Sequence, residues 1–434
     1  MFKKDVNNVC VIGLGYVGLT LAVTLAESGF KVFGIEKNQK TLDALLKGKP
    51  HFHEKGLAEL LVKQSENNLK LLSEIPDEHM DCFIIAVSTP VDSKTKKPLM
   101  DYIIKATNEI LPHLTSGQLI VLRSTLPIGT TRNTVLPILQ TKSKDFYLSF
   151  CPERTAEGKA MEELRTLPQV VGGLNEESAD YSVELFSRIS PLVIRTSSLE
   201  AAEIVKLVNN SYRDMMFAYA NQIALICKGL GLNASEVVEA ANLGYPRSNV
   251  QKPGIVGGFC LEKDPHILIN SANCDCSLIK AAKSINEDIP SHILESIKEH
   301  AKKNNKALKD SKIFISGFAF KGHPETDDLR SSQAVKLASL LQENDMNIYG
   351  HDFIVPENLI NELKVKPCSI EDGFENADFV VFMNNHKKYN DIKIEDLIKK
   401  MKKDGFIFDG WQIFYDQLKN ISSDISYESI GVKK

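Results

Sequence analysis

Short, almost entirely apolar runs alternate with helical patterns near the start of the chain, and this rhythm limits the fold more than any other feature. Six such runs indicate strands, at residues 9–12, 31–35, 82–87, 119–122, 147–150 and 192–194. Strands that are apolar throughout are typical of parallel sheets covered by helices on both faces. We therefore predict an α/β, doubly wound parallel sheet in a first domain that spans residues 1–199.

The middle of the chain is predicted to be helical. One long pattern covers residues 200–228 and is ended by Gly229 and Gly231, a second covers 234–242, and a third covers 278–303. The segment 243–263, which joins the second and third helices, is rich in glycine and proline. We assign residues 200–304 to a central helical domain.

The strand–helix rhythm then returns, which predicts a second Rossmann-like domain over residues 305–434. Its expected strands are 312–316, 347–350, 379–383 and 406–408. Parts of this half echo the first: Gly350-His-Asp resembles Gly34-Ile-Glu, and the segment from Ile313 resembles the segment from Val9. The echo lacks the third glycine of the phosphate loop, so it should bind a different ligand or bind one differently.

Composition excludes several classes of protein. The 434 residues are 43% hydrophobic and 25% charged, which is typical of a globular protein with more than one domain. A net charge of −4 argues against a nucleic-acid partner. No apolar run approaches the roughly 18 residues of a membrane span, and no signal peptide is apparent. The eight scattered cysteines suit the cytoplasm, and Cys274 and Cys276 lack the further ligands that a metal site needs.

The phosphate-loop motif Gly13-Leu-Gly15-Tyr-Val-Gly18 follows the first strand and opens a helix. In this context the glycines allow a tight turn, a close approach to a pyrophosphate, and close packing of helix against strand. Glu36 follows the second strand, where a carboxylate binds a ribose 2′-hydroxyl and repels a 2′-phosphate. We therefore predict NAD as the cofactor.

Polar clusters follow several other strands. Ser88-Thr89-Pro90, Arg123-Ser124-Thr125 and Cys151-Pro-Glu153-Arg154 each begin where a strand is expected to end. The carboxyl ends of parallel strands share one edge, and that edge is where open α/β sheets bind ligands. On the long helix, Lys206 and Asn210 are four residues apart and share a face, so they could stabilise a developing oxyanion.

Cys260 stands in the loop Gly257-Gly258-Phe-Cys260, shortly before Asp264-Pro265. Asp264 fits a helix N-cap and Pro265 fits the first helical position. Cys260 would then precede a helix N-terminus and lie near Lys263, and both features favour the thiolate. We predict a nucleophilic cysteine, against the alternative of a thiol that merely packs.

With these motifs the chain resembles the UDP-glucose/GDP-mannose dehydrogenase family over nearly its whole length. The resemblance rests on the segments named above and on Ser124–Thr130, Pro152–Gly158, and Phe320-Lys321-Gly322 followed by Asp328-Leu-Arg330-Ser331. It implies catalytic roles for Cys260, Lys206, Asn210, Glu153, Asp264 and Thr125. It implies cofactor contacts from Gly13, Gly15, Tyr16, Val17, Gly18, Glu36, Thr89, Pro90, Thr125 and Arg330. It implies substrate contacts from Glu153, Arg154, Glu157, Lys206, Asn210, Arg213, Arg247, Gly257 and Lys321.

The resemblance also implies a reaction and an assembly. NAD would oxidise the C6 alcohol of a UDP-sugar to a uronate in two steps, through a thiohemiacetal and a thioester on Cys260, for polysaccharide biosynthesis. The long helix would form a homodimer or a higher homo-oligomer. Arg247 resembles an arginine that is lent to the neighbouring subunit's substrate site. Glu153 and Asp264 both remain candidates for the general base.

Two departures from the family pattern bear on the substrate. Glu262 replaces a common proline, and Asp409-Gly-Trp411 replaces the Asp-Gly-Arg of glucose-specific members. The sequences around Arg213 and Arg247 favour UDP-N-acetyl-D-mannosamine, with UDP-N-acetylglucosamine and UDP-glucose as alternatives. Two further readings stay open: a two-electron NAD dehydrogenase without covalent catalysis, and a non-catalytic protein that senses NAD.

Overall fold

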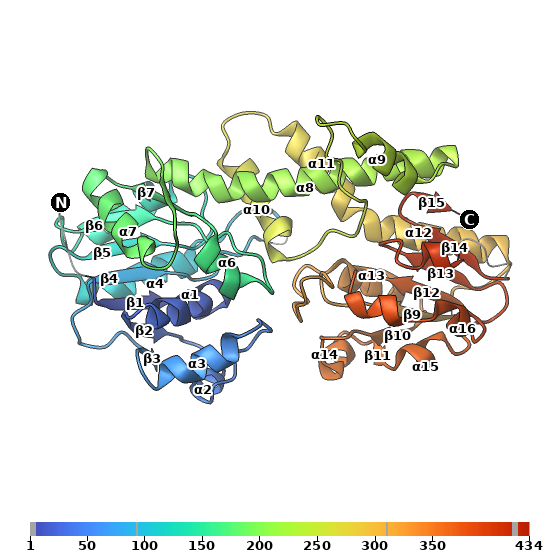
Figure 1. The fold of residues 1–434 in the computed structure, drawn as a ribbon, viewed down its shortest axis with the longest axis horizontal. Helices are drawn as coiled ribbons and strands as arrows, with labels where there is room; N and C mark the ends of the chain where they lie inside the picture. Colours follow the sequence, from blue (N-terminus) through green and yellow to red (C-terminus); the bar gives the residue numbers. More distant parts are fainter. Residues whose placement is uncertain (1–5, 93, 310, 419–423, 434) are drawn as a thin grey trace. The chain divides into compact units, whose positions relative to one another are not determined.

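A computed structural model describes residues 6–92, 94–309, 311–418 and 424–433 (Figure 1). The chain forms two compact units. The first contains the residues up to Asn210 together with His266–Asp275, and the second contains Ser211–Pro265 together with the residues from Cys276 onward. Helices α8 (Leu199–Leu230) and α10 (Phe259–Ser271) each contribute residues to both units.

The first unit is built on an eight-stranded sheet of order β3-β2-β1-β4-β5-β6-β7-β8. All neighbouring strands are parallel except β6 and β7, which are antiparallel. The strands are β1 Asn8–Ile12, β2 Lys31–Ile35, β3 Leu69–Leu72, β4 Cys82–Ile85, β5 Leu119–Leu122, β6 Tyr147–Phe150, β7 Gln169–Gly173 and β8 Val193–Arg195. The six predicted strands are all present within one or two residues, and β3 and β7 are additional.

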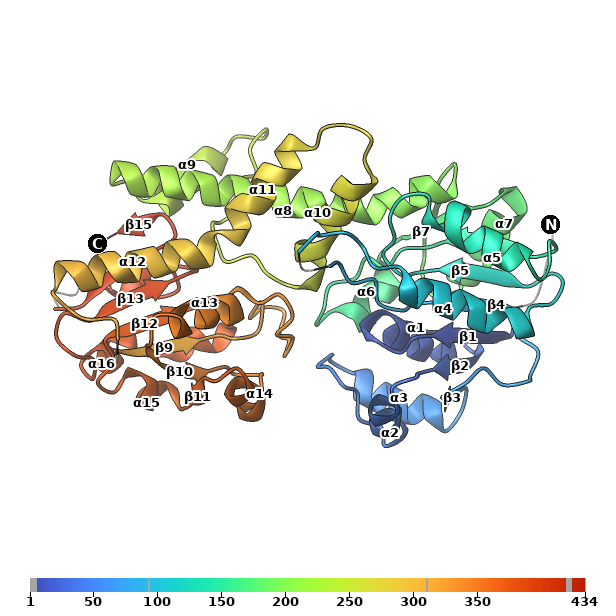
Figure 2. The same ribbon diagram turned by 180° about the vertical axis from the view of Figure 1, so that it is seen from behind.

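Helices cover both faces of this sheet (Figures 1 and 2). They are α1 Tyr16–Glu27, α2 Gln39–Leu46, α3 Leu57–Ser65, α4 Asp101–Ile110, α5 Leu136–Gln140, α6 Ala160–Thr166 and α7 Glu176–Ser187. Alternate strand residues serve the two sides: Val9 and Val11 pack with α1, α3 and α7, whereas Cys10 and Ile12 pack with α4 and α5. Burial on both faces explains why these strands are apolar throughout.

The second unit contains a seven-stranded sheet of order β11-β10-β9-β12-β13-β14-β15, parallel except for its last strand. The strands are β9 Lys312–Ser316, β10 Asn347–His351, β11 Lys366–Pro367, β12 Phe379–Phe382, β13 Phe406–Asp409, β14 Ser426–Ser429 and β15 Val432–Lys433. The α/β, doubly wound class predicted for both ends of the chain is therefore confirmed.

Helices cover both faces of the sheet of the second unit, with α12 and α13 on one face and α15 and α16 on the other. Beyond the parts of α8 and α10 that belong to it, the helices of this unit are α9 Ala234–Asn242, α11 Ser277–Glu287, α12 Ile289–Lys303, α13 Gln333–Gln342, α14 Glu357–Glu362, α15 Ile370–Phe374, α16 Ile394–Ile398 and α17 Tyr415–Leu418. Ile313 and Ile315 face the cluster that includes α12 and α13, which lie in front of the sheet in Figure 2. Phe314 faces the cluster that includes α15 and α16.

Two helix predictions need correction. The single helix expected over 278–303 is broken at Asp288 into α11 and α12, and Pro290 lies in the first turn of α12, where its missing N–H breaks no hydrogen bond. The helix after the cysteine loop begins at Phe259 and not after Asp264, so Asp264 and Pro265 lie inside α10. Gly258 has a left-handed φ of 97° directly before this helix, which marks its true start.

Among the described residues, no helix combines the length and apolar character that crossing a bilayer requires.

Candidate functional site

The glycine loop between β1 and α1 has three different steric environments. Gly13 adopts a φ of 89°, and a Cβ at Gly18 would stand 1.8 Å from the carbonyl oxygen of Gly13. Neither position can accept a side chain without strain. A Cβ at Gly15, in contrast, would meet nothing within 4 Å. The loop therefore leaves open space at its middle glycine, where a pyrophosphate would approach the start of α1.

Glu36 lies next to this loop, directly after β2. Its Oε2 accepts a hydrogen bond from the backbone N–H of Leu14 at 3.2 Å, and its Oε1 accepts one from Asn38 at 2.8 Å. The carboxylate is thereby held at the carboxyl edge of the sheet, beside the open glycine. This arrangement fits NAD, because a carboxylate here binds ribose hydroxyls and repels a 2′-phosphate.

The ends of β4 and β5 are joined at the same edge. The hydroxyl of Thr89 donates to the carbonyl oxygen of Thr125 at 2.6 Å, and the hydroxyl of Ser124 donates to Val87 at 2.6 Å. Pro90 follows Thr89 directly. The cofactor-contact residues assigned to the first unit therefore follow adjacent strands of one sheet.

Glu54 ties the cofactor loop to the segment after β6. Its carboxylate is buried and accepts hydrogen bonds from the hydroxyl of Tyr16 and from the backbone N–H groups of Gly158 at 2.7 Å and Ala160 at 3.0 Å. Burial and this bond to Glu54 raise the pKa of Tyr16. Tyr16 and the neighbourhood of Glu157 are thus linked through Glu54. Sequence reasoning missed this residue, since it lies in a polar stretch with no recognisable motif.

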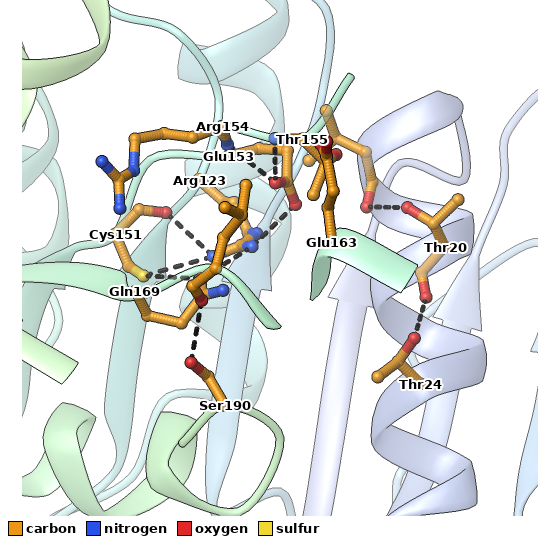
Figure 3. Close-up of polar contacts among 12 residues, drawn as sticks. Thr20, Thr24, Arg123, Cys151, Glu153, Arg154, Thr155, Glu163, Gln169 and Ser190 are labelled. Carbon is orange, nitrogen blue, oxygen red and sulfur yellow. Dashed lines mark hydrogen bonds and ion pairs between the residues drawn. The ribbon is translucent and has the colours of Figure 1, made fainter. Parts of the chain in front are cut away.

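Glu153 is buried at the carboxyl edge of the sheet and paired with Arg123 (Figure 3). Its Oε2 accepts a bond from Arg123 at 2.7 Å, and its Oε1 accepts bonds from the backbone N–H groups of Arg154 at 2.7 Å and Thr155 at 2.9 Å. Burial alone would raise the pKa of Glu153, but the Arg123 charge and these bonds outweigh it, so the pKa is lowered. Glu153 is therefore an anion near neutral pH.

Lys206, on α8, is only 7% exposed. Its positive charge contributes to the lowered pKa of Glu153, so the two groups act on each other within the first unit. One turn before it, the buried Glu203 accepts bonds from the backbone N–H and hydroxyl of Thr131 at 2.8 and 2.6 Å. These bonds fix the start of α8 against the segment after β5. Asn210 follows Lys206 by one turn of the same helix.

In the second unit, Cys260 lies in the first turn of α10 and is partly exposed. A thiol in this position is close to the unpaired N–H groups of a helix N-terminus, which favour the thiolate. A Cβ at Gly257 would stand 3.0 Å from the carbonyl oxygen of Ser331, and one at Gly258 would stand 2.6 Å from the ring of Phe320. The two glycines thus let the segment before Cys260 pack closely on the residues that follow β9.

Arg330 and Lys321 lie in that same segment. The Arg330 guanidinium is positioned over the ring of Phe259 at 4.9 Å and forms an ion pair with Asp328. Lys321 directly follows Phe320, the residue against which Gly258 packs. The second unit therefore gathers Gly257, Cys260, Lys321 and Arg330 around the start of α10.

Asp264 and Lys263 form a buried ion pair at 2.6 Å inside α10. The Lys263 ammonium also lies 5.1 Å from the centre of the Phe259 ring. The sequence predicted Lys263 near Cys260, and the structure gives the charge of Lys263 a carboxylate partner one residue away.

Arg213 and Arg247 are exposed on the surface of the second unit. Arg213 projects from α8, and Arg247 stacks over the ring of Tyr245 at 4.7 Å.

The predicted site residues are divided between the two units. The first holds the glycine loop, Glu36, Thr89, Pro90, Thr125, Glu153, Arg154, Glu157, Lys206 and Asn210, and the second holds Arg213, Arg247, Gly257, Cys260, Asp264, Lys321 and Arg330.

The internal echo seen in the sequence extends to hydrogen bonds. Asp352, directly after β10, accepts a bond from the backbone N–H of Ala319 at 2.9 Å, as Glu36 does from Leu14. Gly317 has a φ of 96°, close to the 89° of Gly13.

Within the described residues, no three histidine, cysteine or acidic side chains gather as a metal site would require.

A doubly wound sheet with this glycine loop and a carboxylate after the second strand is typical of a protein that binds NAD. Comparison with family models narrows the class. Residues 7–190 match the NAD binding domain, 200–288 the central domain and 314–416 the UDP binding domain of the UDP-glucose/GDP-mannose dehydrogenase family. The chain belongs to this family, and it is an NAD-dependent nucleotide-sugar dehydrogenase.

Similar proteins agree with this assignment. The chain is 33% identical to the UDP-N-acetyl-D-mannosamine dehydrogenase of Methanococcus vannielii, with 92% of each chain covered. The enzyme of that name from Methanocaldococcus jannaschii is 35% identical, over 90% of this chain and 88% of the relative. A solved UDP-D-ManNAc dehydrogenase from Pyrococcus horikoshii matches with a TM-score of 0.88 and 30% identity, over 98% of this chain and 99% of that chain.

Proposed function

We propose that the enzyme oxidises the C6 alcohol of UDP-N-acetyl-D-mannosamine to the carboxylate, with Cys260 as covalent nucleophile. The observation that carries the covalent step is the position of Cys260 in the first turn of α10, behind two glycines. A helix N-terminus favours the thiolate, which is the nucleophilic form of the thiol. The similar proteins named above support the choice of substrate.

The reaction balances as two oxidations followed by a hydrolysis. The alcohol loses a proton and a hydride and becomes an aldehyde, to whose carbon the Cys260 sulfur adds. The thiohemiacetal then loses a second hydride to give a thioester, and water replaces the sulfur to release the carboxylate. NAD, when bound, accepts the hydride in both oxidations, so two NADH form per sugar.

The remaining site residues would serve this chemistry. Lys206 and Asn210 stabilise the oxygen on the reacting carbon as it gains charge, and one such donor is typically worth about 3 to 4 kcal/mol of barrier. Glu153 or Asp264 accepts a hydrogen bond from the hydrolytic water, and Thr125 assists. Tyr16, Val17, Glu36, Thr89, Pro90 and Arg330 contact the cofactor. Arg154, Glu157, Arg213, Arg247 and Lys321 contact the nucleotide sugar.

The residue at position 411, a tryptophan, argues against specificity for glucose. A Cβ at Gly254 would stand 2.5 Å from the Trp411 ring, and the indole N–H donates to Met383 at 3.3 Å. The side chain is thus packed against the cysteine loop. It cannot supply the charge that arginine gives to glucose-specific members at this position.

A substrate panel tests the assignment. Purified enzyme with NAD is offered UDP-N-acetylmannosamine, UDP-N-acetylglucosamine, UDP-glucose and GDP-mannose, and the initial rate of NADH formation is measured. We expect the highest kcat/KM with UDP-N-acetylmannosamine. A higher kcat/KM with any other sugar would reject UDP-N-acetylmannosamine as the substrate. It would leave the covalent mechanism in place.

We propose that the enzyme is a homodimer, or a higher homo-oligomer, joined through α8. Tyr212, Tyr219, Ile226 and Leu230 are exposed on this helix at intervals of seven, seven and four residues. This spacing places them on one face, as in helices that pack against a partner. Leu243 and Tyr245, near Arg247, are also exposed, which supports the idea that Arg247 reaches a neighbouring subunit.

Placing aspartate on this face should separate the subunits. The double substitution Tyr212→Asp with Tyr219→Asp should raise the dissociation constant of the dimer by roughly 10⁶-fold, at about 2 kcal/mol for each of the four aromatic anchors lost from the two subunits. Light scattering after size exclusion measures the mass. Leu46→Asp, at an equally exposed leucine on α2, is the control and should leave the mass unchanged. An unchanged mass for the α8 variant would contradict the proposed interface.

We also propose the domain roles predicted from the sequence: NAD binding by residues 1–199, dimerisation and catalysis by 200–304, and nucleotide-sugar binding by 305–434.

The free, buried thiols of Cys10, Cys82, Cys151 and Cys227 suit a reducing compartment, so we place the enzyme in the cytoplasm.

A further inference from the structure

Arg123 is an arginine with no solvent exposure in the first unit, at the carboxyl end of β5. Its guanidinium donates to Glu153 at 2.7 Å, to the Gln169 side chain at 3.1 Å, and to the carbonyl oxygen and sulfur of Cys151 at 3.2 Å each (Figure 3). It also lies 5.2 Å from the centre of the Phe186 ring. These contacts leave the guanidinium a single orientation.

A buried ion pair of this kind needs an explanation beyond stability. Taking two charges out of water costs several kcal/mol for each ion, and a well-packed apolar pair is often as stable. The side chains of Arg123 and Glu153 are 0% and 4% exposed. An arginine that also donates to three other acceptor atoms while it holds one carboxylate is suited to fixing that carboxylate in place.

We propose that Arg123 is a positioning residue for the last step of the reaction. It holds Glu153 in one orientation as an anion, so that this carboxylate accepts a hydrogen bond from the water that hydrolyses the Cys260 thioester. The proposal rests on the proposed function, in which Glu153 is one of the carboxylates that could serve this water.

The surroundings of Glu153 set the direction of the effect. The positive charges that act on it are Arg123 after β5 and Lys206 on α8, and the backbone N–H of Arg154 also donates to it. Burial raises the pKa of the neighbouring Cys151 thiol to about 11, so that group is neutral. Without Arg123, the burial of Glu153 would dominate and its pKa would rise. The carboxyl would then take up a proton at a higher pH than it does in the wild-type enzyme.

The test compares Arg123→Met and Arg123→Lys with the wild-type enzyme. For Arg123→Met we expect the acidic limb of the kcat–pH profile to move upward by roughly one to three pH units, the range over which an adjacent arginine shifts a carboxyl. Below the shifted limb, intact-mass spectrometry should detect a thioester that accumulates on Cys260. Arg123→Lys keeps the charge and should restore most of the wild-type profile.

Arg188→Met is the control for loss of an arginine that stacks on an aromatic ring. Arg188 lies 3.7 Å from the Phe30 ring centre and donates to the carbonyl oxygen of Val6, within the first unit. Its removal should leave the pH profile and the mass spectrum unchanged. NADH binding to each variant checks that the first unit is folded.

The inference is overturned if folded Arg123→Met keeps the wild-type pH profile and accumulates no thioester. If Arg123→Met does not fold, the test passes to Arg123→Lys in a Glu153→Gln background. In that background, adding Arg123→Lys should change neither the pH profile nor the thioester level relative to Glu153→Gln alone. A difference between these two variants would contradict the proposal. Failure of the proposed function is a separate outcome, because Cys260→Ser would then still form two NADH per sugar.

Discussion

Replacing Cys260 by serine should lower the rate of uronate formation by roughly 10⁴- to 10⁶-fold. Removing one residue of a protease catalytic triad lowers the rate by a similar factor. A serine hydroxyl at the first turn of α10 stays protonated near neutral pH and is a far weaker nucleophile than a thiolate. The variant should therefore form no thioester. Continuous measurement of NADH with UDP-N-acetylmannosamine, joined to chromatography of the sugar products, gives the size of the loss.

Cys368→Ser serves as the matched control in the same unit. Burial raises the pKa of the Cys368 thiol to about 11, so this cysteine is a neutral packing group. Its replacement should leave the rate close to that of the wild type. Equal losses in the two variants, or a wild-type rate in Cys260→Ser, would remove Cys260 from the mechanism.

Adding one methyl group at Gly18 should disrupt the first unit and its cofactor site together. The new Cβ would stand 1.8 Å from the Gly13 carbonyl oxygen, and neither backbone segment can move away cheaply. We expect Gly18→Ala to lower the free energy of unfolding of the unit by about 3 kcal/mol or more. If the distorted loop loses a similar free energy of NAD binding, the affinity for NAD falls about 100-fold. Thermal unfolding and NADH titration measure the two effects.

Two other glycines provide controls for this prediction. Gly15→Ala should weaken NAD binding without lowering the melting temperature, because Gly15 has an ordinary φ of −68° and open space around it. Gly229→Ala, within α8, should raise helix stability by about 1 kcal/mol and leave NAD binding unchanged. Normal stability of Gly18→Ala would mean that the loop is less tightly packed than the structure indicates.

The sheet was largely predictable because its central strands are buried on both faces. β1, β2, β4, β5 and β6 are almost entirely apolar, which is typical of strands buried on both faces. β3 carries the exposed Lys70 in its middle, and β7 ends in two glycines, so neither has the pattern of a buried parallel strand. These edge and antiparallel strands depend on neighbours that the local sequence does not reveal.

The start of α10 was mispredicted for a physical reason. Asp264 and Pro265 carry the preferences of an N-cap and a first helical residue, and both principles are sound locally. In the folded chain, close packing of Gly258 on Phe320 places the helix start six residues earlier, at Phe259. Tertiary contact overrode a local preference, and it moved Cys260 from the loop into the helix.

Motif residues of the candidate site were accessible from the sequence, whereas the residues that hold them were not. Glu54 meets Gly158 across 104 positions, and Glu203 meets Thr131 across 72. Arg123 was visible only as part of a polar cluster, since its partner Glu153 lies 30 positions away. Such pairs follow from strand order, which brings distant segments to one edge of the sheet.

The central claim is a four-electron oxidation through a thioester on Cys260. The most direct measurement counts NADH formed per UDP-N-acetylmannosamine consumed by the wild-type enzyme, while rapid acid quenching and mass spectrometry follow the peptide that contains Cys260. The account predicts two NADH per sugar and a transient acyl adduct on that peptide. One NADH per sugar with an unmodified Cys260 would contradict it.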